Sequence, residues 1–180
     1  MKKKIIPKVL CVIPAKKSSR RLKKKNKKII NGHPMIAWTI NEAKKTKKIS
    51  DLIVSTDCEK IMKIAREYGA STPFKRPSRL SKSNIDNYAV IDHSLKFMEK
   101  TLKIKYDIII LLQPTSPVRD FKHIDETILK LWNSGFNTAA SVKGPFKKKR
   151  DPIIKKIKNN KLIPWCSHSK SNPEEFYLYN

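Results

Sequence analysis

The chain of 180 residues contains no apolar run near the ~20 residues that a membrane-spanning helix needs. Its charged start, Lys2–Lys4, precedes only a short apolar stretch with no small-residue cleavage site, which argues against a secretory signal. The cysteines Cys11, Cys58 and Cys166 lie far apart and form no CxxC pair, so neither a disulfide frame nor a zinc site is expected. These absences favour a cytoplasmic protein with reduced thiols and no membrane partner.

Acidic residues are scarce: 15 Asp and Glu stand against 41 Lys and Arg, for a net charge of +26. Such an excess makes nucleic acid a possible partner. Most of the cations are lysine, however, whereas base readout and bidentate phosphate contacts favour arginine. A row of aromatic residues suited to base stacking is also missing. We therefore expect non-specific adhesion at low salt and no specific nucleic-acid partner, and a basic nucleic-acid-binding protein stays as an alternative.

Apolar patterning predicts alternating strands and helices. Short apolar runs predict strands at residues 9–13, 52–54, 108–112 and 138–142, and the run at 108–112 is expected to be central and covered on both faces. Helices are predicted after Pro34, after Asp57, from Tyr88 and from Ile124, where apolar residues recur at helical spacing. Because the joints are short, the alternation predicts a doubly wound, mostly parallel α/β sheet.

Single residues mark several expected element ends. Asp57 is expected to cap the second helix, and Gly69 and Gly135 to close the second and fourth. Tyr88 is placed on the apolar face of the third helix, and His93 is assigned to packing there. Beyond residue 142 the alternation stops, and a small hairpin is expected around Asn159-Asn160.

The loop after the first strand is strongly basic. It runs from Pro14 to Asn26, and its cations are Lys16, Lys17, Arg20, Arg21, Lys23, Lys24 and Lys25. A loop at the carboxyl end of the first strand lies where open α/β sheets bind ligands. A polyanion, with phosphate as the first guess, suits such a loop; charge alone would equally allow a solvated lysine-rich loop.

The order of residue types in this loop resembles the nucleotide-binding signature of the sugar-acid cytidylyltransferases, enzymes that load sialic-acid-like sugars onto CMP. The matching residues are Ala15, Ser19, Arg20, Arg21, Leu22, Lys25 and Asn26. Lys16 stands where arginine is usual, and Lys17-Ser18 replaces a pair that usually contains glycine. The resemblance implies a Rossmann-like three-layer αβα nucleotide-diphospho-sugar transferase fold with a mostly parallel sheet.

A second segment, Thr72–Ser81, is similar to the family's Pro-Phe-x-Arg-Pro-x-x-Leu element. The arginine of that element reaches the nucleotide, which points to Arg76. The continuation matches poorly, and there Asn87 could replace a hydroxyl contact near the base.

A third segment, Gln113–Arg119, follows the strand expected at 108–112. It resembles the Gln-Pro-Thr-Ser-Pro-Leu-Arg block of the acylneuraminate branch with one conservative change. An amide and two hydroxyls at a strand's carboxyl end suit recognition of a polyhydroxylated sugar, and they come from Gln113, Thr115 and Ser116.

The resemblance implies a nucleotidyl transfer in which CMP passes from CTP to a nonulosonic acid and pyrophosphate leaves. Lys16 and Lys25 would act as catalytic cations that neutralise developing charge. Ser19 and backbone amides near Ala15 would hold phosphate and nucleotide. The implied nucleotide-binding residues are Ala15, Ser19, Arg20, Asn26, Arg76 and Asn87, and the implied sugar-binding residues are Gln113, Thr115, Ser116 and Lys147.

The family also implies Mg²⁺ and a homodimer, but the metal ligands cannot be identified in this sequence. We assign residues 1–142 to the nucleotide-binding α/β core and 143–180 to a basic arm used in dimerisation. The chain stops at the approach to a family strand, before the carboxylate pair that holds magnesium in the family. It is therefore expected to be a poor catalyst alone, and a catalytically incomplete nucleotide-binding fragment is the alternative function.

Overall fold

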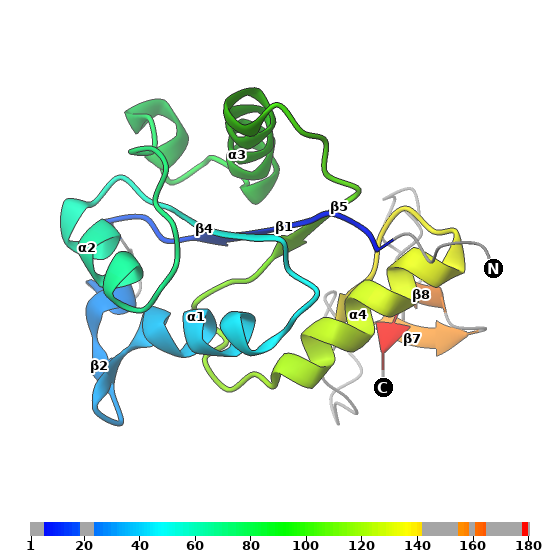
Figure 1. Cartoon of the computed structure of the whole chain (residues 1–180). Helices are drawn as coiled ribbons and strands as arrows, with labels where there is room; N and C mark the ends of the chain where they lie inside the picture. The colour runs from blue at the N-terminus through cyan, green and yellow to red at the C-terminus, as the bar shows by residue number, and fades with distance from the viewer. Residues whose placement is uncertain (1–5, 19–23, 142–154, 159–160, 165–177, 180) are drawn as a thin grey trace. The chain divides into compact units, whose positions relative to one another are not determined.

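The computed structural model of the chain describes residues 6–18, 24–141, 155–158, 161–164 and 178–179 (Figure 1). The chain forms two compact units, Met1–Phe121 and Lys122–Asn180. The expected division after residue 142 stays a prediction.

The first unit is built on a parallel sheet in which β1 (Val9–Pro14) lies between β4 (Asp51–Ser55) and β5 (Ile108–Leu111). Pro14 pairs with Ser55, and Val12 pairs with Leu111. The parallel pairing confirms the doubly wound arrangement. The strand with the most apolar run is not the central one, however: β1 is, and Val9 to Ile13 are completely buried. In the described sheet β5 has a strand on one side only, and most of its residues are half-buried.

Helices cover both faces of this sheet. Figure 1 shows α1 (Met35–Lys45) and α3 (Asn87–Leu102) on opposite faces. Because side chains alternate along a strand, Leu10 and Val12 point to one face, where they pack with Ile53 of β4 and Met98 of α3. Burying such side chains contributes about 1.5–3 kcal/mol each.

The rim of this core contains partly buried side chains, Phe74, Leu95, Phe97, Tyr106 and Ile109. The His93 ring stands edge-on to Phe74 with centroids 4.8 Å apart, which confirms its packing role. Tyr88 is 76% exposed, so its placement on the apolar face of α3 was wrong. It is the second residue of α3, two positions after the N-cap Asp86, whose side chain accepts from Ala89 N–H at 2.9 Å.

Helix α2 spans Glu59–Glu67 and has Tyr68 as its C-cap. Gly69 follows at φ 88° and closes the helix as expected. The chain then passes along the outer side of β4, where single parallel bridges join Ser71 to Ile53 and Lys75 to Thr56. The remaining short elements of this unit are η1 (Lys25–Lys27), β2 (Ile29–Ile30), β3 (His33–Pro34) and η2 (Ser78–Ser81).

The second unit contains α4 (Phe121–Ser134), which starts at the last residue of the first unit, and four short strands. Strands β6 (Ala140–Ser141) and β9 (Leu178–Tyr179) pair in parallel. Strands β7 (Lys155–Lys158) and β8 (Lys161–Pro164) pair antiparallel, which confirms the hairpin. Gly135, at φ 69°, follows α4 as expected. None of the helices in the described residues is both long and apolar enough to span a membrane.

Candidate functional site

The candidate site lies where the three parallel strands of the first unit end. Pro14 ends β1 beside Ser55, the last residue of β4, and β5 ends at Leu111, two residues before Gln113. Parallel strands bring their carboxyl ends to one edge of a sheet, which is where open α/β folds bind ligands. Three segments singled out from the sequence therefore start from, or bond to, one edge of the sheet.

The backbone of the basic loop is held at three successive residues. Ala15 N–H donates to Ser55 O at 2.9 Å, and Lys17 N–H donates to Asp57 Oδ1 at 2.7 Å. Between them, Lys16 O accepts from Asn26 Nδ2 at 3.2 Å. The amide N–H of Ala15 itself is thus bonded to the end of β4, and the assignment of Ala15 and its neighbouring amides to nucleotide binding stays a prediction.

Asp57 does not cap α2, contrary to the sequence prediction. The N-cap of α2 is Cys58, whose side chain makes no capping hydrogen bond. The backbone N–H of Cys58 donates to Thr56 Oγ1 at 3.1 Å. The Asp57 carboxylate turns to Lys17, 40 positions earlier in the chain. A local motif could not reveal this contact, because the acceptor meets its donor only once β1 and β4 pair.

Arg76 is buried against the end of β4, with 4% of its surface exposed. Its Nε donates to Ser55 Oγ at 3.1 Å, Nη2 donates to Ser55 O, and its backbone N–H donates to Thr56 O at 2.8 Å. Burial lowers the pKa of Arg76 to about 10, and the Asp57 charge partly opposes this. The guanidinium therefore fixes Ser55, the same residue that binds the start of the loop.

The loop re-enters regular structure at η1. Lys24 precedes it with φ 56°, Lys25 is half-buried, and Asn26 is 4% exposed. Asn26 Oδ1 is buried without a hydrogen-bond partner among the described residues. Buried amide oxygens are normally satisfied, so this atom is suited to accept from a ligand. Asn87 is exposed at the start of α3.

Gln113 is exposed and its loop closes on itself. Ser116 N–H donates to Gln113 O at 3.3 Å, and Thr115 Oγ1 lies 3.4 Å from Gln113 Oε1. Arg119 Nη2 also donates to Gln113 O, at 3.3 Å. Burial lowers the pKa of Arg119, whose guanidinium lies near Cys11 of β1. Arg119 ends the segment Gln113–Arg119, but the sequence predicted no role for it. Its half-buried side chain is hydrogen-bonded to the first residue of that segment and so links the two ends of the loop.

Three predicted site residues, Ser19, Arg20 and Lys147, lie outside the described residues. Among the described residues no cluster of acidic, histidine or cysteine side chains has the arrangement to hold a metal ion. The Asp57 carboxylate at the strand ends is already bonded to the loop backbone. The described residues thus do not fit a magnesium site, and Mg²⁺ stays an expectation.

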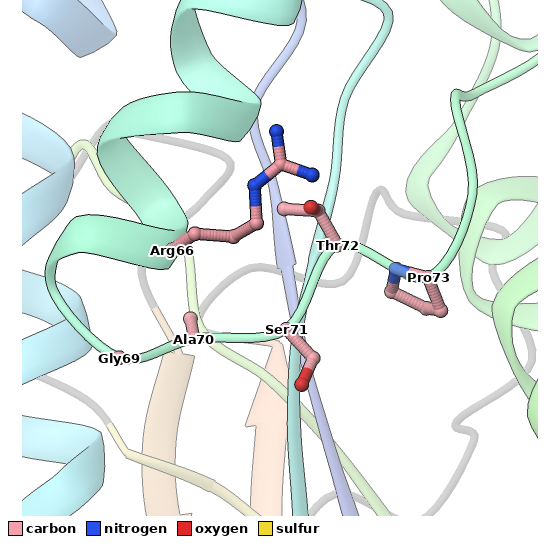
Figure 2. A pocket seen from close by; sticks show the side chains of 6 residues that line it. All are labelled: Arg66, Gly69, Ala70, Ser71, Thr72 and Pro73. Carbon is pink, nitrogen blue, oxygen red and sulfur yellow. The ribbon is translucent and has the colours of Figure 1, made fainter.

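A separate hollow, open to solvent, lies beside the end of α2 and is lined by Arg66, Gly69, Ala70, Ser71, Thr72 and Pro73. Figure 2 shows Arg66 extending from α2 toward Thr72. The hollow contains none of the residues predicted for the site. We therefore place the candidate site at the strand ends.

The chain is similar to curated enzymes that activate acidic sugars. It is 40% identical over 112 residues to a CMP-N,N'-diacetyllegionaminic acid synthase of Legionella pneumophila, covering 62% of this chain and 47% of that protein. It is 35% identical over 121 residues to an N-acylneuraminate cytidylyltransferase of Escherichia coli, covering 67% and 27%. A pseudaminic acid cytidylyltransferase of Campylobacter jejuni is 32% identical over 121 residues, covering 67% and 50%. The chain thus spans about half or less of these relatives' lengths.

Solved structures show the same fold. A CMP-2-keto-3-deoxy-manno-octonic acid synthetase complexed with CTP superposes with a TM-score of 0.60 at 22% identity, covering 74% of this chain and 52% of that one. A cytidylyltransferase from Leptospira borgpetersenii superposes with a TM-score of 0.55 at 27% identity, covering 72% and 51%. These neighbours confirm the Rossmann-like α/β fold. Residues 10–166 match the cytidylyltransferase family, and the chain belongs to that family.

Proposed function

We propose that this chain binds CTP and takes part in transfer of CMP to a nonulosonic acid, with release of pyrophosphate. The observation that carries the proposal is the anchored basic loop: the backbone of Ala15 is bonded to Ser55 of β4, that of Lys16 to Asn26 of η1, and that of Lys17 to Asp57 just after β4. Gln113 follows β5, so its amide and the described loop cations Lys16 and Lys17 lie at the same end of the sheet. That combination suits a triphosphate and a polyhydroxylated acceptor.

The proposed step is a displacement at phosphorus. The anomeric hydroxyl of the sugar acid attacks the α-phosphorus of CTP, the bond from that phosphorus to the bridging oxygen breaks, and pyrophosphate leaves while the hydroxyl gives its proton to solvent water. Lys16 and Lys25 offset the charge that builds on the phosphates, and Gln113 orients the sugar. Such catalysis is mainly positioning and electrostatic stabilisation. Since the described carboxylates do not fit a metal, we assign no step to magnesium.

The proposed acceptor class follows from the relatives' names and from the Gln113 loop. Legionaminate, N-acylneuraminate and pseudaminate are the acidic sugars of the similar proteins. The exposed Gln113, Thr115 and Ser116 offer the amide and hydroxyls that their ring substituents require. We further propose that the protein works in the cytoplasm as a homodimer, which sedimentation analysis would reveal as twice the 20.9 kDa chain mass.

Two measurements test the function in order. Calorimetry should show that CTP binds better than ATP or GTP, and equal affinity for the three would contradict a cytidine site. A coupled assay should then show pyrophosphate release that requires both CTP and one of the three acidic sugars. If CTP binds but none of the sugars supports release, the catalytically incomplete nucleotide-binding fragment becomes the better description.

A further inference from the structure

Asp57 places a carboxylate beside a loop whose proposed ligand is a polyanion. On charge alone this residue would weaken triphosphate binding, because like charges repel. Its contacts indicate another role. The carboxylate accepts a charge-assisted hydrogen bond of 2.7 Å from Lys17 N–H, while the N-cap of α2 is its neighbour Cys58.

Asp57 is one of three groups that set the loop backbone. Ser55 O holds the Ala15 amide, Asn26 holds the Lys16 carbonyl, and Asp57 holds the Lys17 amide. Ordering these residues costs conformational entropy, which such contacts must offset. Two of the three holding groups are side chains, so substitutions can release the loop without disturbing strand pairing.

The surroundings of Asp57 are cationic. The hydrogen bond and charge of Glu59 raise the pKa of Lys75, and the Asp57 charge adds to this; burial lowers the pKa of Arg76, and the Asp57 charge opposes that lowering. These neighbouring charges partly neutralise the carboxylate, so its repulsion of a bound phosphate is reduced. Its effect through the position of the loop then outweighs its direct charge effect.

We propose that Asp57 is a positioning residue of the triphosphate-binding loop, which holds Lys16 and Lys17 where they receive the phosphates. Removing it weakens CTP binding although a negative charge is deleted. This inference rests on the proposed CTP site. It predicts that loss of Asp57 weakens CTP binding, whereas electrostatic repulsion alone predicts that the loss strengthens it.

The experiment is calorimetric CTP titration of the full chain and three variants. Asp57→Ala is expected to lower affinity about tenfold, the loss of one charge-assisted contact. Asp57→Asn keeps an oxygen acceptor for Lys17 N–H and is expected to stay within about threefold of the parent. Glu59→Gln is the matched control: Glu59 is exposed in the first turn of α2, pairs with Lys75 at 2.7 Å, and makes no hydrogen bond to the loop backbone within the described residues 14–18 and 24–26. Its loss of charge is expected to leave affinity unchanged or slightly higher.

Amide hydrogen exchange at Lys17 gives a second measurement that needs no nucleotide. Exchange should be faster in Asp57→Ala than in the parent and close to the parent in Asp57→Asn, with thermal unfolding midpoints showing that all variants are folded. Unchanged exchange in Asp57→Ala, or affinity that is equal or higher, overturns the proposal. If Asp57→Ala does not fold, a large loss in Asp57→Asn overturns it as well. A parent chain that binds no CTP refutes the proposed function itself, a result distinct from parent binding with an unaffected Asp57→Ala.

Discussion

At the scale of single residues, the candidate site depends on polar side chains that are buried to hold backbone. Arg76 and Asn26 are each 4% exposed, and both spend their donors on neighbouring protein groups. Leaving such a buried group unpaired costs about 1–3 kcal/mol. Arg76 acts on the end of β4. Asn26 acts on the loop, and its Oδ1 is buried without a hydrogen-bond partner among the described residues.

Lys25→Ala is expected to weaken CTP binding tenfold or more, since one charge-assisted contact contributes about 1.5–3 kcal/mol. Calorimetry with the parent and the variant measures this. Lys28→Ala is the control. Lys28 is an exposed lysine at the C-cap of η1, and its substitution removes the same charge three positions from Lys25. Equal losses in both variants would show a general charge effect and would remove Lys25 from the site.

His93 is expected to make stability depend on pH. Burial lowers the pKa of His93, and Arg79 and Arg76 lower it further against the opposing Asp92. The unfolded chain binds the proton near pH 6.5, so protonation favours unfolding. The stability contributed by neutral His93 is complete above pH 6.5. It is lost as the pH falls from 6.5 through the lowered pKa of the folded state.

Urea unfolding at pH 7.5 and pH 5.5 tests this. The midpoint of the parent should fall more between the two values than that of His93→Gln, which cannot take up the proton. The paired carboxylates Glu59 and Glu99 have lowered pKa values, so their contribution to stability is complete above pH 4.5 and changes only below it, outside this interval. An identical fall in the parent and the variant would show that His93 does not couple to folding.

At the scale of elements, the end of α2 combines a backbone requirement with a side-chain contact. Gly69 follows the helix at φ 88°, and Lys44 of α1 donates from Nζ to Tyr68 O at 3.1 Å. A Cβ on residue 69 would lie 2.5 Å from that Nζ. The glycine thus allows both the left-handed turn and the α1–α2 contact.

Gly69→Ala is expected to destabilise the fold by about 1.5–3.5 kcal/mol, the sum of left-handed strain of ~1–2 kcal/mol and a lost hydrogen bond of ~0.5–1.5 kcal/mol. Gly32→Ala is the matched control, because Gly32 has φ 82° with nothing within 4 Å of the added carbon. Chemical denaturation should therefore show a larger loss for Gly69→Ala. Equal losses would mean that Lys44 contributes nothing at this end.

At the scale of the whole molecule, charge is the dominant property, since +26 spread over 180 residues creates a strongly positive chain. At the candidate site the positive charges lie on a loop whose backbone is held by hydrogen bonds. Elsewhere they lie on exposed lysines such as Lys28, Lys44 and Lys63. A positive field of this kind speeds encounter with any polyanion. It does not by itself select one.

Binding to DNA or RNA is therefore expected to be independent of sequence and to collapse between 50 mM and 200 mM salt, because it comes from counterion release. Fluorescence anisotropy with two unrelated duplexes measures both properties. CTP affinity, which also uses fixed hydrogen bonds, should fall less over the same range. A nanomolar complex selective for one duplex at physiological salt would instead support the nucleic-acid-binding alternative.

The sequence by itself determined the features that depend on local order. The alternation of apolar runs predicted the parallel α/β sheet, Gly69 and Gly135 marked helix ends, and the residues around Asn159-Asn160 marked a hairpin. The family followed from the order of residue types in three segments, 14–26, 72–81 and 113–119. These succeed because helix ends, turns and loop signatures are encoded over a few neighbouring residues.

Only the tertiary structure decided how the site is held together. Asp57 bonds to Lys17 and not to its own helix, Arg76 bonds to Ser55, and Arg119 closes the loop that begins at Gln113. It also decided that β1 lies between β4 and β5 in the part of the sheet that the structure describes. A donor such as Lys17 N–H meets an acceptor 40 residues away only after β1 and β4 pair, so the contact depends on the fold and not on neighbouring residues.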